Sequence, residues 1–177
     1  MRELRTERLY LRFLRREDVP AIFENWARDP AVTRFLTWNP HESPETTGRV
    51  MDKWLPDYEK PDTYRYGIEL TADGELIGMI DVVGYHHGNP VIGYCSGRRW
   101  WGNGYMTEAL HAVTEMLCSE GYDTIVIEAA SDNIGSNRVI QKNGFTLVQV
   151  YEAPLSDGKP EIITKNSYRL YRRTAAT

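Results

Sequence analysis

The stretch that decides the fold is 98-RRWWGNGYMTEALHAVTEMLCSE-120, in which a glycine-containing turn opens onto a long helix. From Tyr105 onward the residues are good helix formers, and Gly121 ends the pattern. The apolar positions recur with the helical period, at Met106, Ala109, Leu110, Val113, Met116 and Leu117. We therefore predict an amphipathic helix that packs its apolar stripe on the core of an α/β domain.

The residues before this helix form a candidate phosphate site. Gly102 and Gly104 allow a tight turn and a close approach of the backbone to a ligand, and the first amides of a helix have no intrahelical acceptor. Arg98 and Arg99 precede the turn and can add charge-assisted hydrogen bonds to an anion. A plain strand-to-helix connector remains the alternative. The stretch has neither the Gly-Lys-Ser/Thr of a P-loop nor a third glycine at the dinucleotide-binding spacing.

A second informative stretch is 133-NIGSNRVIQKNGF-145. Its residues predict a polar turn and a short helix that is capped near Gly135 or Ser136 and closed by Gly144. A strand at 146–151 should follow. These features alone require no function.

Together the two stretches resemble the GNAT superfamily of acyl-CoA-dependent N-acyltransferases. The spacing Arg99-x-x-Gly102-x-Gly104 resembles the pyrophosphate-binding motif of that superfamily, within the similar segment 93–109. The segment 133–145 looks like the matching part of its ribosomal-protein N-terminal acetyltransferase branch, in the same order and at the same separation. The resemblance implies one GNAT-like domain over residues 1–177, with acetyl-CoA as co-substrate and an amine as acceptor.

The remaining patterns fit such a domain. Alternation and turn residues predict strands at 8–14, 64–70, 76–85, 91–96, 124–130, 146–151 and 162–171. Helices are expected after Asp18 as N-cap, around 31–35 and from 45 to about 58. Residues 174–177 form a short tail. The fold class is α/β, with a mixed, mostly antiparallel sheet of about seven strands and helices on both faces.

The resemblance also assigns a cofactor path. Arg99 and the amides from 101 to 107 would hold the pyrophosphate, which involves Trp101, Gly102, Asn103, Gly104, Tyr105, Met106 and Thr107. Pantetheine would pair with the backbone of Tyr94, Cys95 and Ser96 and with the side chain of Asn133. Arg138 and Lys142 are candidates for phosphate or adenosine contacts, with a solvated surface role as the alternative.

For catalysis the resemblance points to Ser136, beside Asn133, as the hydrogen-bond donor to the thiolate, and to the Cys95 amide as the oxyanion donor. Many relatives carry a tyrosine where Ile140 stands, and Val91 replaces a glutamate that often precedes Ile-Gly-Tyr. Glu128, Asp81 and Glu69 remain as candidate bases, and Glu128 is placed with the catalytic residues.

The acceptor is left open among several classes. An α-amine with a pKa of about 7.7 to 8.0 is deprotonated more easily than a lysine amine near 10.4, and the branch favours a protein N-terminus. Polyamines, amino acids or aminoglycosides are alternatives, and so is an acyl-CoA-binding module without turnover. Trp38 and Tyr94 are the candidate substrate contacts, although Trp38 can equally be a core residue.

Composition narrows the class of protein. The 177 residues are 41% hydrophobic and 26% charged, which is typical of a folded domain rather than a disordered chain. A net charge of −4 argues against nucleic acid as a partner, and no apolar run is long enough to span a membrane. A cytoplasmic location is expected. The two cysteines, Cys95 and Cys118, are predicted to be free thiols, and His86-His87 lacks the companions of a metal site.

Overall fold

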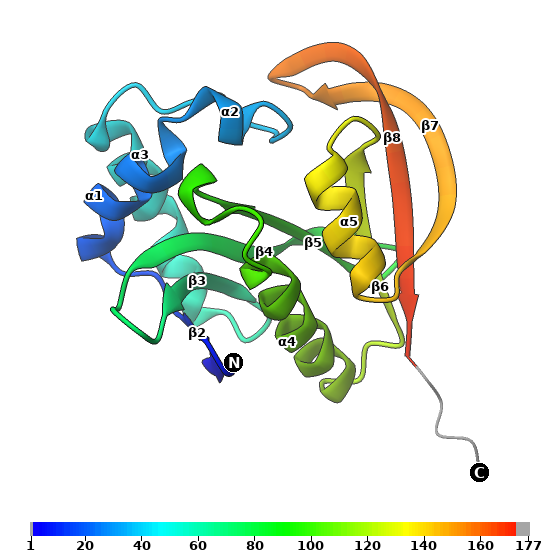
Figure 1. The fold of residues 1–177 in the computed structure, drawn as a ribbon, viewed down its shortest axis with the longest axis horizontal. Helices are drawn as coiled ribbons and strands as arrows, with labels where there is room; N and C mark the ends of the chain where they lie inside the picture. Colours follow the sequence, from blue (N-terminus) through cyan, green and yellow to red (C-terminus); the bar gives the residue numbers. More distant parts are fainter. Residues whose placement is uncertain (1, 173–177) are drawn as a thin grey trace.

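The structure is a computed structural model that describes residues 2–172; the expected tail at 174–177 lies outside this range. Its strands are β1 (Leu4–Arg5), β2 (Leu9–Arg12), β3 (Arg65–Leu70), β4 (Leu76–His86), β5 (Asn89–Ser96), β6 (Thr124–Ala130), β7 (Thr146–Ser156) and β8 (Lys159–Tyr171). Its α-helices are α1 (Val19–Ile22), α2 (Pro30–Thr33), α3 (Pro44–Trp54), α4 (Tyr105–Ser119) and α5 (Ile134–Lys142) (Figure 1).

Within the described residues the strands form one sheet in the order β1-β2-β3-β4-β5-β6-β8-β7. Every pairing is antiparallel except that of β5 with β6. The mixed, mostly antiparallel sheet is therefore confirmed. The sheet has eight strands rather than about seven, because the two-residue β1, which is too short to show alternation, pairs with β2.

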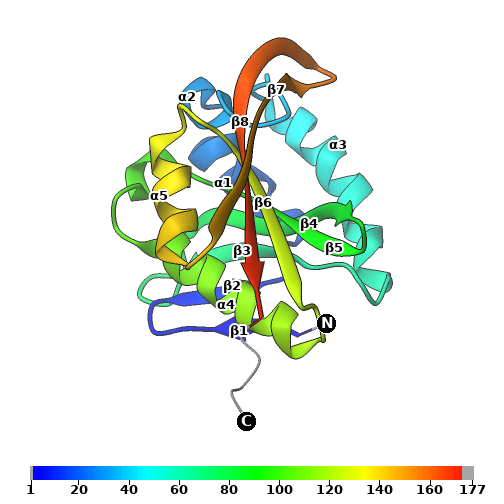
Figure 2. The same cartoon turned by 90° about the vertical axis from the view of Figure 1, so that its right-hand side faces the viewer.

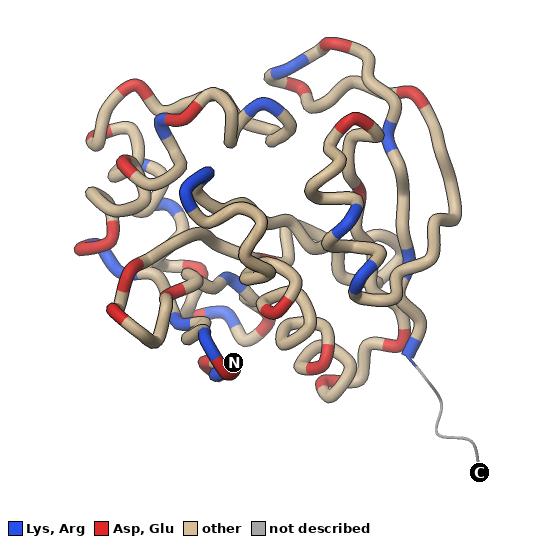
Figure 3. The backbone as a smooth tube through the Cα atoms, in the orientation of Figure 1, with Lys and Arg blue, Asp and Glu red and all other residues tan. Residues whose placement is uncertain are grey.

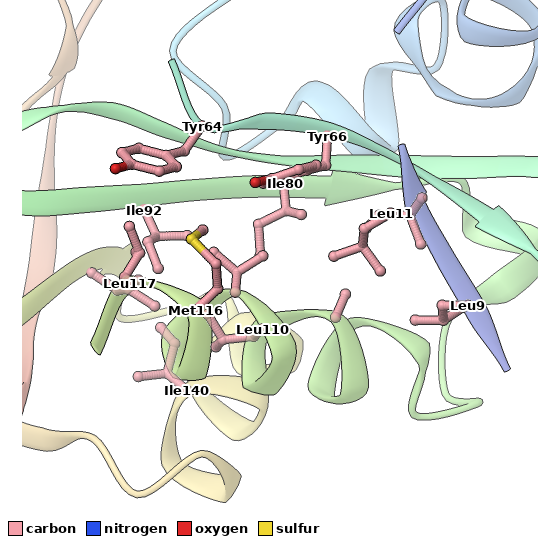
Figure 4. Close-up of a cluster of buried hydrophobic side chains, with 14 of the residues drawn as sticks. Leu9, Leu11, Tyr64, Tyr66, Ile80, Ile92, Leu110, Met116, Leu117 and Ile140 are labelled. Atoms are coloured by element: carbon pink, nitrogen blue, oxygen red, sulfur yellow. The ribbon is translucent and has the colours of Figure 1, made fainter. Parts of the chain in front are cut away.

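Helices cover both faces of the sheet, as expected. Ile80 and Met79 are neighbours on β4, and since successive strand residues point to opposite faces, they lie in two different apolar clusters. The cluster around Ile80 includes Leu110, Leu117 and Ile140 from α4 and α5 (Figure 4). The predicted stripe on α4 is thus its core-facing side.

The opposite face is covered by α1, α2 and α3, which lie together beyond β4 (Figures 1 and 2). Trp26 and Met51 fill the cluster on this side with Met79. Asp18 is the N-cap residue of α1, as predicted, but its side chain makes no capping hydrogen bond to that helix. Asp18 lies in a 3-10 turn (Arg16–Asp18), and its carboxylate accepts from the Arg15 amide at 2.7 Å and pairs with the buried Arg12 at 2.8 Å.

The hairpin of β7 and β8 is longer than predicted and arches toward α2 (Figure 1). Near its tip, Ser156 Oγ donates to the carbonyl of Thr37 at 2.8 Å, and Lys159 Nζ donates to that of Thr33 at 2.6 Å. These contacts join the last two strands to the end of α2 and to the segment that follows it. None of the helices in residues 2–172 combines the length and the apolar character needed to cross a membrane.

Candidate active site

The sheet opens between β5 and β6. The two strands pair only at Val91 with Val126 and at Ile92 with Ile127. Beyond that point β5 continues beside β4 through Ser96, while β6 continues beside β8 through Ala130. The facing edges at residues 93–96 and 128–130 therefore carry main-chain groups that no sheet partner takes, which leaves a gap for an extended ligand.

The register decides which amides face this gap. The Gly97 amide donates to the Ile77 carbonyl on β4 at 2.9 Å, and antiparallel ladders bond alternate residues, so Cys95 exchanges its bonds with Met79. The amides of Tyr94 and Ser96 point the other way, toward β6. The expectation that the Cys95 amide stabilises the oxyanion is therefore corrected: Tyr94 and Ser96 present their amides to the gap.

Two cavities meet at the gap. One, of about 460 Å³, extends from β5 toward the start of α4 and includes Gly102, Trp101 and Met106. The other, of about 440 Å³, extends over the α3 side of the sheet and includes Trp38, Trp54, Asp81 and Glu128. We call these the α4-side cavity and the α3-side cavity. Both are lined by the same central residues, namely Phe35, Leu36, Tyr94, Cys95, Asn133 and Ser136.

A hydrogen-bonded pair stands where the cavities join. The Tyr94 hydroxyl lies 2.9 Å from Ser136 Oγ, and it also donates to the Ser136 carbonyl at 3.3 Å. This contact links β5 to α5 across the gap. Burial raises the pKa of the Tyr94 phenol well above its usual range, so the pair holds its protons at neutral pH.

The position of Ser136 is set by two asparagines. Asn133 caps α5, because its Oδ1 accepts from the Ser136 amide at 3.2 Å. The cap is therefore Asn133, two or three residues before the cap predicted near Gly135 or Ser136, and the helix begins at Ile134. Next to it, the buried Asn137 donates to the carbonyls of Ala130 and Asn133. Its Oδ1 accepts from the hydroxyl of Tyr168 at 2.7 Å, which fixes α5 to β8.

The glycine turn has the geometry of an anion site. Gly102 and Gly104 have φ values of 78° and 80°, and Gly104 is the N-cap of α4. Among residues 2–172, no acceptor is bonded to the amides of residues 102–107. Free amides at the N-terminus of a 15-residue helix provide the donors that a pyrophosphate requires. The residues present thus fit the phosphate portion of acetyl-CoA.

The nearby arginines are paired with carboxylates. Arg98 binds Asp29 at 2.6 Å, and Arg99, whose side chain is 73% exposed, binds Glu75 at 3.1 Å. An exposed pair of this kind is weak, so Arg99 can exchange Glu75 for a phosphate. Arg138 and Lys142 are exposed on α5, where Lys and Arg positions are blue in Figure 3, but neither lines the α4-side cavity.

The three candidate bases occupy different surroundings. Glu69 on β3 accepts a hydrogen bond from Arg12 Nε at 2.5 Å and lines neither cavity. It therefore belongs to the structural ion pairs that Arg12 forms. Glu128 is exposed in the α3-side cavity and accepts from the Tyr151 hydroxyl at 2.8 Å. Asp81 is buried in the same cavity, and burial raises the pKa of its carboxyl to about 6 against the attraction of Arg65.

The walls of the α3-side cavity are largely aromatic and aliphatic. Trp38 packs against the apolar cluster beneath α1 and α3, and it also lines the cavity. Trp54 lines the cavity from α3, beneath the Arg65 guanidinium. Leu155, Ile163 and Lys165 from the β7–β8 hairpin complete the lining.

The two cysteines and the histidine pair at residues 86–87 lie in different surroundings. Cys95 and Cys118 are free thiols, as expected, and burial raises the pKa of Cys95, so that thiol stays protonated. Among the residues that the structure describes, no group of histidine, cysteine, aspartate and glutamate has a metal-binding arrangement. His86 and His87 are exposed where β4 turns into β5.

Sequence reasoning missed the groups whose partners are distant in the chain. Asn137 stands inside the second motif, yet its anchoring role depends on Tyr168 and Asn166 on the last strand. No local sequence pattern predicted that the β7–β8 hairpin lines the α3-side cavity. The sequence did carry one indication for Asn137, because an asparagine in the interior of a short helix is unfavourable unless its side chain is hydrogen-bonded.

Comparisons with known proteins agree with this geometry. Residues 8–146 match the acetyltransferase (GNAT) domain family. YoaA, an uncharacterised N-acetyltransferase of Bacillus subtilis, is 33% identical over 148 residues, which cover 80% of this chain and 81% of YoaA. An uncharacterised N-acetyltransferase of Bacillus licheniformis, p20, is 30% identical over 149 residues, covering 82% and 83% of the two chains.

Solved structures share the fold. RimL, a ribosomal L7/L12 α-N-protein acetyltransferase in complex with coenzyme A, superposes with a TM-score of 0.83 at 23% identity, over 96% of this chain and 98% of that one. The microcin C7 self-immunity acetyltransferase MccE, in complex with acetyl-CoA and AMP, gives 0.81 at 18% identity over 94% of each chain. The family match, the relatives and the open sheet with its free helix amides together show that this chain belongs to the GNAT family of acetyl-CoA-dependent N-acetyltransferases.

Proposed function

We propose that this protein transfers the acetyl group of acetyl-CoA directly to a primary α-amine, with a protein N-terminus as the favoured acceptor. The observation that carries the proposal is the meeting of the two cavities at Tyr94 and Ser136. The α4-side cavity, with its free amides, suits the cofactor. The α3-side cavity, with its carboxylates and aromatic walls, suits the amine.

In this arrangement pantetheine runs along the gap and pairs with the open edge of β5 at Tyr94 and Ser96. The Trp101 indole already donates to the Ser96 carbonyl at 2.8 Å, so the Tyr94 groups and the Ser96 amide are left for the ligand. An amide on this edge stabilises the oxyanion of the tetrahedral intermediate, and Ser136 donates to the departing thiolate. Asn133 retains its amide nitrogen for pantetheine while its oxygen caps α5.

The preference for a protein N-terminus rests on the resemblance of residues 133–145 and on the fold of RimL, which is an α-N-protein acetyltransferase. A small-molecule amine is the second candidate. The observation that favours it is the β7–β8 hairpin, which adds Leu155, Ile163 and Lys165 to the wall of the α3-side cavity and is held by contacts to Thr33 and Thr37.

A panel of acceptors tests the proposal. The purified chain is mixed with acetyl-CoA and with short peptides that have free or blocked N-termini, amino acid amides, polyamines or aminoglycosides, and thiol release is followed. We expect release with free N-termini and none with blocked ones. Turnover of polyamines or aminoglycosides alone would transfer the assignment to the small-molecule class. Tight acetyl-CoA binding with no turnover of any amine would support a non-catalytic module instead.

A further inference from the structure

Asp81 is a buried carboxylate with an incomplete set of partners. It lies on β4, its residue surface is 8% exposed, and it lines the α3-side cavity. Buried carboxylates are normally held by several donors. Within residues 2–172, one side-chain contact reaches Asp81, a 3.3 Å hydrogen bond from Arg65 Nε to Oδ2. Its second oxygen, Oδ1, is left to the cavity.

A glycine on the neighbouring strand leaves open space beside Oδ1. Asp81 is paired with Gly93 on β5, and a methyl group at Gly93 would lie 3.8 Å from Oδ1 and 2.8 Å from Val83. Because position 93 has no side chain, Oδ1 stays open on the cavity side of β5. Gly93 immediately precedes Tyr94, where the open edge and the Ser136 contact mark the reaction centre.

We propose, on the basis of the proposed function, that Asp81 is the catalytic base, and that its Oδ1 receives the acceptor as an ammonium ion and takes its proton. Asp81 is favoured over Glu128, the other carboxylate of the α3-side cavity. Glu128 is exposed and already accepts a hydrogen bond from Tyr151, whereas Asp81 lies deeper, opposite the strand that borders the gap.

The proposed reaction begins with the acceptor bound as an ammonium ion. One N–H bond of the ammonium breaks, and the proton moves to Asp81 Oδ1, which leaves a neutral amine. The amine nitrogen attacks the thioester carbon, forming the C–N bond, and collapse of the tetrahedral intermediate breaks the C–S bond. The thiolate takes the second proton from nitrogen through the Ser136 and Tyr94 hydroxyls, giving coenzyme A and an N-acetyl amide. Asp81 then releases its proton to water.

Several charged and titratable groups lie around Asp81. They are Arg65 on β3, Tyr58 in the 3-10 turn after α3, Cys95 on β5, and Glu128 and Lys165 across the cavity. Burial outweighs Arg65 and raises the carboxyl pKa to about 6. Proton transfer from an α-ammonium of pKa about 7.7 to 8.0 is then unfavourable by roughly 50- to 100-fold, against more than about 20,000-fold from a lysine-type ammonium near 10.4. An α-amine is therefore the easier acceptor to deprotonate at this carboxylate.

Arg65 is a positioning residue in this scheme. Its guanidinium bonds Asp81 through Nε and Asp57 through Nη1, both at 3.3 Å, and lies 4.6 Å from the centre of the Trp54 ring. It fixes the Oδ2 side of Asp81 and so leaves Oδ1 free. It also holds the carboxyl pKa below the value that burial alone would give.

The test compares Asp81→Asn, Glu128→Gln and the control Asp52→Asn, an exposed aspartate on α3 that pairs with Arg16. The acceptors are seryl-alanyl-alanine amide, which has an α-amine, and n-butylamine, whose amine is as basic as that of lysine. Calorimetry with acetyl-CoA establishes that each variant is folded and binds the cofactor. We expect Asp81→Asn to lower kcat/KM for the peptide at pH 7 by at least about 100-fold, with acetyl-CoA affinity within twofold of wild type. Glu128→Gln should lose less than tenfold, and Asp52→Asn should match wild type.

The pH dependence of turnover supplies a second test. For the wild type, kcat/KM for the peptide should reach its maximum between about pH 6 and 8, whereas Asp81→Asn should rise continuously to the pKa of the peptide amine. Arg65→Gln should shift the acidic limb to higher pH. The inference is overturned if Asp81→Asn retains a kcat/KM for the peptide within threefold of wild type, or if Glu128→Gln loses more activity than Asp81→Asn. It is also overturned if the wild-type pH profile has no decline on its acidic side. Failure of wild-type turnover with every amine would instead contradict the proposed function.

Discussion

The Tyr94 hydroxyl on β5 lies 2.9 Å from Ser136 Oγ on α5, across the gap where the sheet opens. This contact is the boundary between the two cavities, and the sulfur of a thioester in the gap would lie beside it. The two hydroxyls come from segments 42 residues apart, brought together by the packing of α5 against the sheet.

We expect Ser136→Ala to lower kcat by roughly 10- to 100-fold, because a hydrogen bond to a charged group is worth about 1.5–3 kcal/mol. The acetyl-CoA dissociation constant should change little, since most cofactor contacts lie elsewhere. Tyr94→Phe should give a smaller loss, and the double variant should lose less than the product of the two single effects. Fully multiplicative losses would show that the two hydroxyls do not act together.

The asparagine that anchors α5 should be important for stability. Asn137 is buried and bonds Ala130, Asn133, Asn166 and Tyr168. We expect Asn137→Ala to reduce the free energy of unfolding by about 2–4 kcal/mol, because several buried groups lose a partner. Urea denaturation followed by circular dichroism measures this loss. A change below about 0.5 kcal/mol would mean that the network does not hold the helix in place.

Asp81 should make stability depend on pH in a defined direction. Its carboxyl has a pKa of about 6 in the folded chain and about 3.9 when unfolded. The unfolded chain therefore releases this proton first, and the stability present below about pH 4 is lost as the pH rises through about 6. The full effect is about 3 kcal/mol.

The substitution Asp81→Asn removes the titrating carboxyl and with it this pH-dependent loss of stability. We expect the variant to be more stable than wild type at pH 7 and to have almost no advantage at pH 4, as thermal denaturation at both pH values would reveal. A residue that is costly for stability and required for turnover is typical of a functional carboxylate. Equal melting temperatures of the two proteins at pH 7 would contradict the burial argument.

The phosphate site gives a binding prediction. We expect Arg99→Gln to weaken acetyl-CoA binding about tenfold, which corresponds to one charge-assisted hydrogen bond to phosphate. Binding of acetyl-pantetheine, which lacks the pyrophosphate, should be unaffected. The matched control is Arg28→Gln, because Arg28 is also exposed and pairs with a glutamate. An equal loss for both ligands would show that Arg99 acts on the fold rather than on the phosphate.

Much of this architecture was accessible from sequence because local patterns determine it. The stripe on 105–119, the turn at Gly102 and Gly104 and the strand periodicity each depend on nearby residues. The direction of the Cys95 amide was not accessible, since it depends on the register between β4 and β5. The separation of Asp81, Glu128 and Glu69 into three environments was equally hidden, because burial and the partners Arg65, Tyr151 and Arg12 arise from tertiary packing.

The central claim is that the joined cavities bring acetyl-CoA and an α-amine together at Tyr94 and Ser136. The most direct measurement incubates the wild-type chain with acetyl-CoA and seryl-alanyl-alanine amide and follows free thiol and peptide mass together. We expect coenzyme A and N-acetylated peptide to form at equal rates, and a peptide with a blocked N-terminus to yield neither. Saturable acetyl-CoA binding without any acetylated peptide would contradict the claim.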